Sequence, residues 1–355
     1  MKLVMTLVVR DEADILDAQL AFHLNTGVDF VLAIDYRSQG ETTAILQAYE
    51  RGGHLRLLSE PGEQLWHAEW MTRLARLAAT EHAADWVFCS DADEFWLSPY
   101  GSLKELLAAV PRRYGLVRGV WRHFAPRPDD GGFFAERMTV RTLPVDRPGS
   151  PFPPQVKVAH RAHPSATIHG GNHDADVPGL VPLRGWYPIE VLHFPIRNPE
   201  QCARKYRSWS QATDLDPAAP SRPIVERGVT GADALFEPVA VDGDALARGI
   251  ADGSLAVDTR VRDALRLWRR TDGVRPGFLL GEQAPRLPAP VLAPGDEAAA
   301  LARDVAMLAD RDASGKVSLR VDALEQRVGF LERSLSRRAW ARLTGRRGER
   351  RILVH

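Results

Sequence analysis

Two aspartates separated by one alanine, Asp91 and Asp93, follow directly on a short apolar run, Trp86–Cys89. A continuous apolar run of this length predicts a strand that is buried on both faces of a parallel sheet. The acids then lie at the carboxyl end of that strand, where open α/β sheets bind their ligands. Two carboxylates at this spacing can bind one Mg²⁺ or Mn²⁺ ion, which fills its other positions with water and phosphate oxygens. The pattern therefore predicts a metal site for a phosphorylated ligand, although an ordinary acidic turn after a strand would show the same short motif.

The residues before this acidic pair predict strands that alternate with helices. Apolar residues 3–9 predict a strand that ends at Arg10–Glu12, and residues 28–34 predict a second strand that ends at Asp35. Helices are predicted over residues 13–25, 44–49 and 66–82, and a shorter third strand over residues 54–58. Such alternation predicts a parallel sheet with right-handed crossovers.

The chain after residue 100 predicts a more irregular and partly antiparallel region. Ser102 and Glu105 have the spacing of a capping box, so a helix is expected to begin there. Strands are predicted over residues 114–124, 133–142 and 155–161, and a helix over residues 199–211.

Composition excludes several classes of protein. The chain has 355 residues, of which 45% are hydrophobic, so it can bury a substantial core and is not disordered. Lys plus Arg and Asp plus Glu number 46 each, so the formal net charge is zero and gives no indication of a nucleic-acid partner. The two cysteines, Cys89 and Cys202, argue against a disulfide framework and fit a reducing compartment. The sequence begins with a predicted strand and shows no leader or membrane span, so we expect a cytoplasmic protein, with membrane contact only at its surface.

Three polar segments, in their order along the chain, resemble the landmarks of family 2 type glycosyltransferases with a GT-A fold. These segments are Val9–Asp14, Asp35–Thr42 and Asp91-Ala92-Asp93-Glu94-Phe95. A bacterial subgroup with the Asp-Ala-Asp-Glu-Phe metal motif is the most similar, because it also carries a later segment like Leu192–Pro195. The resemblance covers about residues 1–210.

The resemblance implies an α/β chain with a Rossmann-like, mostly parallel central sheet, helices on both faces and a C-terminal helical extension. Its activity would be metal-dependent transfer of a sugar from a nucleotide-diphosphate sugar to a glycan, such as a cell-envelope polysaccharide, or to a lipid-linked or other hydroxyl acceptor. Inversion at the sugar carbon is expected. Mn²⁺ or Mg²⁺ would neutralise the leaving diphosphate without proton transfer.

The resemblance also implies roles for individual residues. Arg10, Asp11, Glu12 and Asp35 would bind the nucleotide, Asp35 through its base, while Asp91 and Asp93 would hold the metal. The second segment departs from the family pattern at Tyr36 and at Gly40–Thr42, so the accepted base stays open.

Further residues are candidates for the donor site. The resemblance suggests His193 as another metal or diphosphate ligand, although a buried, hydrogen-bonded histidine fits its position equally well. Lys157 stands on a predicted strand and Arg73 on a predicted helix, and either side chain could reach donor phosphates. A surface lysine and a solvated arginine are the plain alternatives.

Inverting transfer needs a base that takes the proton of the acceptor hydroxyl. In similar enzymes this base lies well downstream of the metal motif. His169, His173 and Asp174 cluster around two glycines that permit close approach of backbone to a ligand. We therefore predict Asp174 as the base and His173 as the alternative.

The chain is expected to divide into three parts. Residues 1–212 would form the catalytic domain, with residues 1–100 as its nucleotide-sugar half and residues 101–212 as its acceptor half. Residues 213–295 would form an irregular, short-helical extension, and residues 296–355 a helical C-terminus.

The C-terminal residues predict two kinds of association. Apolar residues at alternating spacings of four and three indicate a coiled-coil seam that could join copies of the chain, although a helix packed on its own domain fits as well. They are Val317, Val321, Leu324, Val328, Leu331 and Leu335. A basic segment with Trp340 follows over residues 337–351, and it would suit an anionic membrane surface or a solvated tail.

Two other functions remain open. A sugar nucleotidyltransferase shares the α/β layout, but it usually carries a glycine-rich basic loop where this chain has Arg10–Glu12. A non-catalytic oligomeric scaffold would leave the acids without a role.

Overall fold

The computed structural model describes residues 1–58, 67–99, 101–143, 155–184, 186–205, 236–237, 239–270 and 277–287. The chain divides into two compact units, Met1–Asp304 and Val305–His355, and all described residues belong to the first. The predicted seam at residues 317–335 and the basic segment at residues 337–351 lie outside the described residues. Among the helices of the described part, none is long and apolar enough to cross a membrane.

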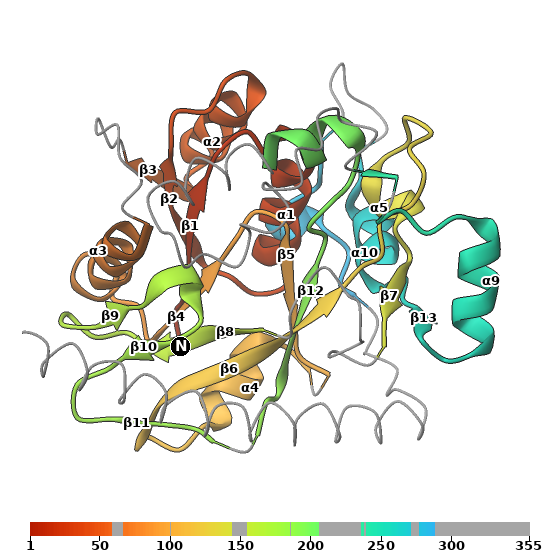
Figure 1. The fold of residues 1–355 in the computed structure, drawn as a ribbon. Helices are drawn as coiled ribbons and strands as arrows, with labels where there is room; N and C mark the ends of the chain where they lie inside the picture. The colour runs from red at the N-terminus through yellow and green to blue at the C-terminus, as the bar shows by residue number, and fades with distance from the viewer. Residues whose placement is uncertain are drawn as a thin grey trace, which may run out of the picture. The chain divides into compact units, whose positions relative to one another are not determined.

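A nine-stranded sheet forms the centre of the first unit (Figure 1). In chain order its strands are β1 (Leu3–Val9), β2 (Phe30–Asp35), β3 (Leu55–Leu58), β4 (Trp86–Ser90), β5 (Glu94–Leu97), β6 (Tyr114–His123), β8 (Val156–Arg161), β11 (Val181–Pro182) and β12 (Ile189–His193). Their order in the sheet is β3-β2-β1-β4-β8-β6-β12-β5, with β11 beside β6. Of these described strands, only β8 and β5 run antiparallel to their neighbours. The mostly parallel α/β sheet predicted from the sequence is confirmed.

The pleat of β1 divides the core into two layers. Leu3, Met5 and Leu7 join one buried cluster, whereas Val4 joins a second cluster on the opposite face. The first face is covered by α1 (Ala13–Asn25), α2 (Glu41–Arg51), α4 (Leu103–Ala109) and α10 (Arg260–Trp268). The second face is covered by α3 (His67–Thr80), which Figure 1 shows on the opposite side of β1 from α1 and α10.

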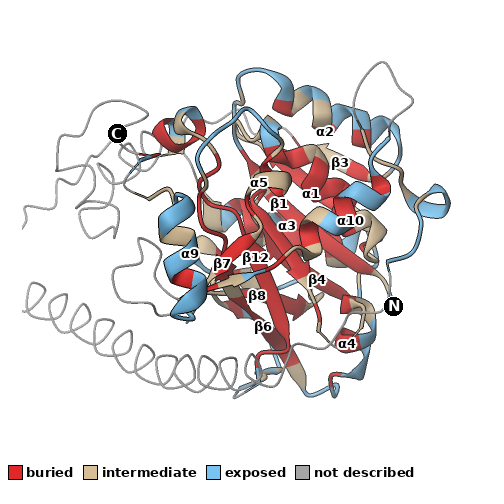
Figure 2. Cartoon of the chain, turned by 90° about the vertical axis from the view of Figure 1, so that its right-hand side faces the viewer, coloured by how far each residue is buried: buried red, intermediate tan, exposed pale blue. Residues whose placement is uncertain are grey.

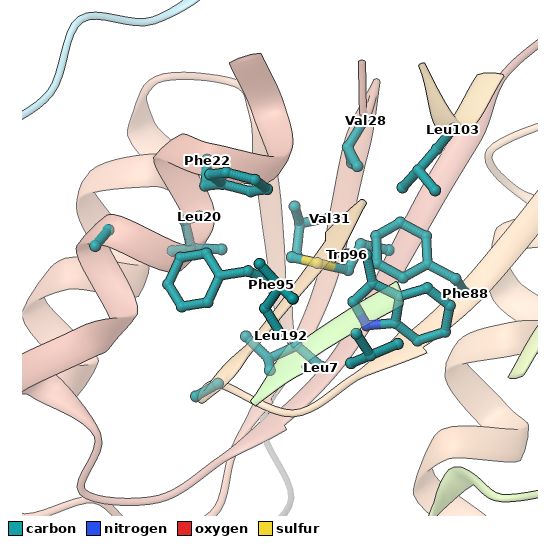
Figure 3. Close-up of a cluster of buried hydrophobic side chains, with 14 of the residues drawn as sticks. Leu7, Leu20, Phe22, Val28, Val31, Phe88, Phe95, Trp96, Leu103 and Leu192 are labelled. Atoms are coloured by element: carbon teal, nitrogen blue, oxygen red, sulfur yellow. The ribbon is translucent and has the colours of Figure 1, made fainter. Parts of the chain in front are cut away.

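Aromatic side chains fill the first layer. Phe22 of α1 meets Phe95 of β5 edge to face, with ring centroids 5.2 Å apart, and Trp96 packs on Phe88 of β4 at 4.8 Å. Figure 3 shows this cluster between α1 and the strands, with Leu192 of β12 beneath it. The central strands are buried along most of their length, while the outer sides of α2 and α9 (Gly243–Ala251) are exposed (Figure 2).

Most predicted elements match the structure, but one is wrong and one strand was missed. The capping box is confirmed, because the amide of Glu105 donates to Ser102 Oγ at 3.2 Å and the amide of Ser102 donates to Glu105 Oε2 at 2.8 Å. The strand predicted over residues 133–142 is wrong: α5 (Phe134–Arg137) precedes a short β7 (Val140–Thr142). Phe134, Ala135 and Met138 are buried, a spacing that suits a helical turn and not an alternating strand. The sequence also missed β5, which pairs with β12.

Described residues between 239 and 270 pack on the same core as the sheet. The short β13 (Leu255–Val257) pairs with β7, and Trp268 of α10 meets Phe22 of α1 with ring centroids 5.9 Å apart. A two-stranded sheet of β9 (Thr167–Ile168) and β10 (Ala175–Asp176) lies beside α3. Cys89 and Cys202 are both free, as expected from the sequence, and both are buried.

His23 makes the stability of this core depend on pH. Its Nε2 accepts from the amide of Trp96 at 3.1 Å, so Nδ1 carries the proton that is donated to the carbonyl of Gln19 at 2.9 Å. Burial lowers the pKa of His23 from 6.5 to about 3. Below pH 6.5 the unfolded chain therefore binds a proton that the folded chain excludes, and the free energy of unfolding should fall by about 1.4 kcal/mol per pH unit towards pH 3. The free energy of unfolding, measured in urea at pH 6.5, 5.5 and 4.5, should fall less steeply with decreasing pH for His23→Gln than for the parent. An equal dependence on pH in both proteins would contradict a neutral, buried His23.

Candidate active site

The carboxyl ends of three parallel strands bring the predicted loops to one edge of the sheet. Val9 at the end of β1 pairs with Asp35 at the end of β2, and Leu7 pairs with Ser90 at the end of β4. The segments that begin at Arg10, Asp35 and Asp91 therefore leave the sheet side by side. This is the place where parallel α/β sheets bind ligands.

The first two loops are tied to each other. The amide of Asp11 donates to Ser38 Oγ at 3.0 Å, and Asp11 Oδ1 accepts from the amide of Gln39 at 2.5 Å. Asp11 holds a positive φ of 55°, a conformation that aspartate adopts more readily than most residues. Asp35 accepts from the amide of Ser38 at 3.1 Å and from the hydroxyl of Thr43. The two carboxylates predicted to bind the nucleotide thus also fix the loops that carry them.

Arg10 and Arg73 lie nearer the surface. The Arg10 guanidinium lies over the ring of Tyr36, 5.3 Å from its centroid, so it is held beside the second loop. Arg73 stands at an exposed position of α3.

Asp91 is held by a buried lysine. Lys157 Nζ of β8 donates to Asp91 Oδ2 at 2.5 Å, lies 3.3 Å from Glu94 Oε1 and donates to the carbonyl of Gly171 at 2.9 Å. These three acceptors match the three N–H groups of an ammonium, and the Lys157 side chain is only 1% exposed. Burial alone would lower the pKa of Lys157, but Asp91 and Glu94 raise it, so the ammonium stays charged. Lys157 therefore supports Asp91 from within the core and leaves no N–H for a phosphate.

Glu94 and Trp121 link the acidic loop to the sheet. Trp121 Nε1 donates to Glu94 Oε1 at 2.6 Å, and the amide of Asp91 donates to Glu94 Oε2 at 3.0 Å. Burial raises the pKa of Glu94, and Lys157 opposes that rise. Because both oxygens of Glu94 already accept from N–H donors, the ionised carboxylate is the form that this geometry fits.

Asp93 lies deeper than Asp91 and is surrounded by cations. Its side chain is 5% exposed, and Oδ2 accepts from Lys205 Nζ, lies 3.5 Å from His193 Nε2 and 4.0 Å from Arg197 Nη1. Burial alone would raise the pKa of Asp93, but Lys205, His193 and Arg197 hold it well below its usual value. Asp93 is therefore a carboxylate in the folded protein.

His193 is oriented by aromatic neighbours. Its ring stacks on Trp121 at a centroid distance of 4.3 Å and an interplanar angle of 13°. Its Nδ1 lies 2.9 Å from Nδ1 of His123, so the two imidazoles share one proton in a hydrogen bond. This contact leaves Nε2 of His193 facing Asp93.

Arg197 joins the first loop to the end of β12. It is fully buried, and it donates from Nε to Asp14 Oδ2 at 2.6 Å and from Nη2 to Asp14 Oδ1 at 2.9 Å and to Glu12. Burial alone would lower the pKa of Arg197, but Glu12 and Asp14 raise it. Glu12, predicted as a nucleotide ligand, is thus placed against Arg197 in the interior of the site.

Asp174 and His173 both contact side chains of β6, those of Arg118 and Trp121. Asp174 Oδ1 accepts from Arg118 at 2.9 Å, and the Asp174 side chain stays 41% exposed. His173 Nδ1 donates to the carbonyl of Val156 at 2.7 Å, and its ring meets Trp121 edge on at 5.6 Å. Burial, followed by the charge of Lys157, lowers the pKa of His173 to about 4, so this imidazole is neutral near pH 7.

Several site residues escaped the sequence analysis. They are Trp121, Asn172, Arg197, Lys205, His67 and His123. Asn172 Nδ2 donates to Asp91 Oδ1 at 3.3 Å, from a backbone with a φ of 61°. His67 begins α3 beside Asp91 and Lys157, and burial lowers its pKa. Arg197 stood two residues after the Leu-His-Phe-Pro segment, which was the one available signal.

The donor set at Asp93 fits a divalent ion. Asp93 Oδ2 and His193 Nε2 are 3.5 Å apart, a separation that two ligands with bonds of about 2.0–2.2 Å to one ion can span. The Lys205 ammonium donates to the same oxygen, Asp93 Oδ2, so a cation already binds to this carboxylate. Within the residues that the structure describes, no three His, Cys, Asp or Glu side chains gather closely enough to hold one ion. An ion at Asp93 would therefore complete its coordination with water and phosphate oxygens, as Mg²⁺ usually does.

Trp121→Phe should measure the hydrogen bond that holds Glu94. The variant loses an N–H donor to a buried carboxylate, and bonds to charged groups contribute about 1.5–3 kcal/mol. In a Glu94→Gln background the same change removes a donor to a neutral amide, worth about 0.5–1.5 kcal/mol. Urea unfolding should show the larger loss for Trp121→Phe in the parent background, and equal losses in the two backgrounds would mean that Glu94 is not ionised.

Arg197→Met should destabilise the fold far more than loss of a surface arginine. The change leaves Glu12 and Asp14, with side chains only 19% and 29% exposed, without their cation. Breaking a buried pair in this way costs about 3–5 kcal/mol. Arg266→Met, which removes an exposed pair with Glu136, should change the stability far less, because water screens an exposed ion pair. Unfolding free energies measured in urea would contradict this account if the two variants were equally stable.

Comparisons with known proteins give partial structural similarities. No protein-family model matches the chain, and no curated protein matches it. A crystal structure of S. aureus TarS 1-349 is 11% identical, with a TM-score of 0.32, over 58% of this chain and 64% of that one. The same fragment in complex with UDP-GlcNAc is 11% identical, with a TM-score of 0.33, over 58% and 65%.

A third similar structure comes from Mycobacterium tuberculosis. It is glucosyl-3-phosphoglycerate synthase in complex with Mn²⁺, UDP and glucosyl-3-phosphoglycerate, which is 21% identical with a TM-score of 0.26 over 34% of this chain and 44% of that one. The chain thus spans less than two thirds of the length of each of these three structures.

Proposed function

We propose that this chain is a GT-A type glycosyltransferase that moves a sugar from a nucleoside-diphosphate sugar to a hydroxyl acceptor, with inversion. The acceptor would be a glycan, a lipid-linked sugar or another alcohol. One observation carries the proposal: Asp91 and Asp93 follow the central parallel strand β4 at the same sheet edge as the loops after β1 and β2. The order of the motifs along the chain supports the same function.

The proposed reaction needs negative charge to be stabilised on the diphosphate. The acceptor oxygen forms a bond to the anomeric carbon, the bond from that carbon to the diphosphate oxygen breaks, and its electron pair leaves with the diphosphate. A divalent ion held by Asp93 and His193, with Asp91 as the other carboxylate of the motif, would neutralise that charge. The loops of Asp11 and Asp35 would orient the nucleoside, with Arg10 and Arg73 on the phosphate side.

Asp174 is proposed as the base of this reaction. Its Oδ1 is fixed by Arg118 while the side chain remains 41% exposed, so the carboxylate is oriented and also open to an acceptor. The proton of the acceptor hydroxyl would pass to Asp174 as the new bond forms. His173, neutral near pH 7, is the alternative base.

Product analysis distinguishes this function from the two alternatives. The protein is incubated with Mn²⁺ and a panel of nucleotide sugars, and separately with Mn²⁺, nucleoside triphosphates and sugar phosphates, and free nucleoside diphosphate and pyrophosphate are measured. A glycosyltransferase releases nucleoside diphosphate from one donor, through transfer or slow hydrolysis. A sugar nucleotidyltransferase instead releases pyrophosphate from a nucleoside triphosphate and a sugar phosphate, and a scaffold protein does neither. Either of the latter results would overturn the proposal.

A further inference from the structure

The two aspartates of the motif carry different kinds of counter-ion. Lys157, the counter-ion of Asp91, belongs to β8 in the middle of the sheet. Its side chain is 1% exposed and has three protein acceptors. Lys205 on Asp93 belongs to the helical residues 199–205, and its side chain is 18% exposed. A lysine has a long flexible stem, so a partly exposed one can swing its ammonium from a buried carboxylate to water. If Lys157 left Asp91, its ammonium would remain buried without a counter-ion, whereas the ammonium of Lys205 can leave Asp93 for water.

Charge counting around Asp93 shows what Lys205 does there. Arg197 contacts three carboxylates, those of Asp93, Glu12 and Asp14, and Lys205 is the second cation of this group. Among the groups in ion-pair contact, three carboxylates and two cations leave a formal charge of minus one. Removal of the ammonium leaves minus two, and a divalent ion in its place brings the group to zero. The cluster therefore suits a divalent ion better than a monovalent one.

The lysine and a metal ion would compete for one oxygen atom, Asp93 Oδ2. Asp93 Oδ2 accepts from Lys205 and lies 3.5 Å from His193 Nε2, so the ammonium uses the same carboxylate oxygen that an ion bound to both residues would need. His193 is fixed by its stacking on Trp121 and by its bond to His123, and both contacts are independent of Lys205. Departure of the lysine would thus leave two donors already in position.

We propose that Lys205 is an exchangeable counter-ion of Asp93, which a divalent ion displaces when the nucleoside-diphosphate donor binds. This inference rests on the proposed function for the identity of the donor, but the exchange itself concerns only metal and lysine. The released ammonium becomes a ligand for the diphosphate, since lysine binds phosphate as a point charge. Metal and diphosphate consequently bind cooperatively, because each needs the lysine to leave the carboxylate.

Metal binding without any sugar tests the exchange. Free Mn²⁺ is measured by electron paramagnetic resonance during titration of the full chain, in the absence of nucleotide. Lys205→Met should bind Mn²⁺ at least about fivefold more tightly than the parent, because a competing cation is gone. Lys205→Arg, which keeps the charge, should stay close to the parent. Lys104→Met is the matched control, because it removes a lysine from an exposed pair with Asp29 of 2.6 Å and should change nothing.

A second pair of measurements fixes the site and the role of the released lysine. Adding Asp93→Asn to Lys205→Met should abolish the gain in Mn²⁺ affinity. With Mn²⁺ saturating, Lys205→Met should bind UDP more weakly than the parent by at least about fivefold. Lys205→Gln repeats both measurements if the methionine variant unfolds.

Three outcomes would overturn the exchange: unchanged Mn²⁺ affinity in Lys205→Met and Lys205→Gln, a gain that survives Asp93→Asn, or unchanged affinity for UDP. Failure of every nucleotide sugar to react, together with the expected Mn²⁺ results, would instead overturn the proposed transferase function and keep the exchange.

Discussion

Asp93→Asn is expected to lower the turnover of the nucleotide-sugar donor by at least about 10²–10³-fold, the range lost when one group that stabilises developing charge is removed. The amide keeps the shape of the carboxylate but loses the charge on which Lys205 and His193 converge. The fold should survive, because Arg197 keeps Glu12 and Asp14, and Lys205 can reach water. Release of nucleoside diphosphate and urea unfolding, measured on the same preparation, report the two effects separately.

Asp85→Asn is a matched control for this change. Asp85 precedes the same strand, β4, at its amino end, where its carboxylate accepts from the amide of Lys2 at 2.6 Å and is 57% exposed. Its loss should leave turnover unchanged. Full activity of Asp93→Asn in the presence of EDTA would show that neither the acid nor a metal serves the reaction.

Asp174→Asn should reduce transfer by about 10²–10⁴-fold, the usual contribution of a general base. Because the carbonyl oxygen of asparagine can still accept from Arg118, the loop should keep its position. Donor affinity should change little, since the base acts only as the acceptor attacks. Single-turnover rates and the KM for the donor would be measured together.

Asp176→Asn provides the control on the same small sheet. Asp176 is 81% exposed and pairs with His169 at 2.9 Å, so its loss should leave transfer intact. If Asp174→Asn transferred sugar at the parent rate, the base would have to be sought at His173, and His173→Gln would then be the variant to measure.

Local patterns were sufficient to predict the layers of the fold. The unbroken apolar run at Trp86–Cys89 became a strand buried on both faces, and the capping box at Ser102 formed as its spacing indicated. Each of these features depends on residues that are close in sequence. The strand at Glu94–Leu97 was missed because its conformation depends on β12, about a hundred residues later, and not on its own alternation.

The polar interior of the site could be predicted only in part. Asp91, Asp93 and His193 stood out because each follows an apolar run that ends abruptly. Trp121 looked like any other residue of a strand, and its contact with Glu94 depends on the order of strands in the sheet. Lys205 lies 112 positions from Asp93, and no periodicity within a helix predicts a pairing over such a separation.

The bonds of Arg197 to Glu12 and Asp14 span 185 and 183 positions of the chain, which has a consequence for synthesis on the ribosome. At about 5–20 residues per second, the acidic loop after β1 waits roughly 10–40 seconds for its guanidinium to be made. During that interval the nascent chain carries Glu12, Asp14 and Asp93 as mutually repelling charges at one sheet edge. The edge of the sheet proposed to hold the nucleotide would therefore reach its final form only after Arg197 has been made and has docked on Glu12 and Asp14.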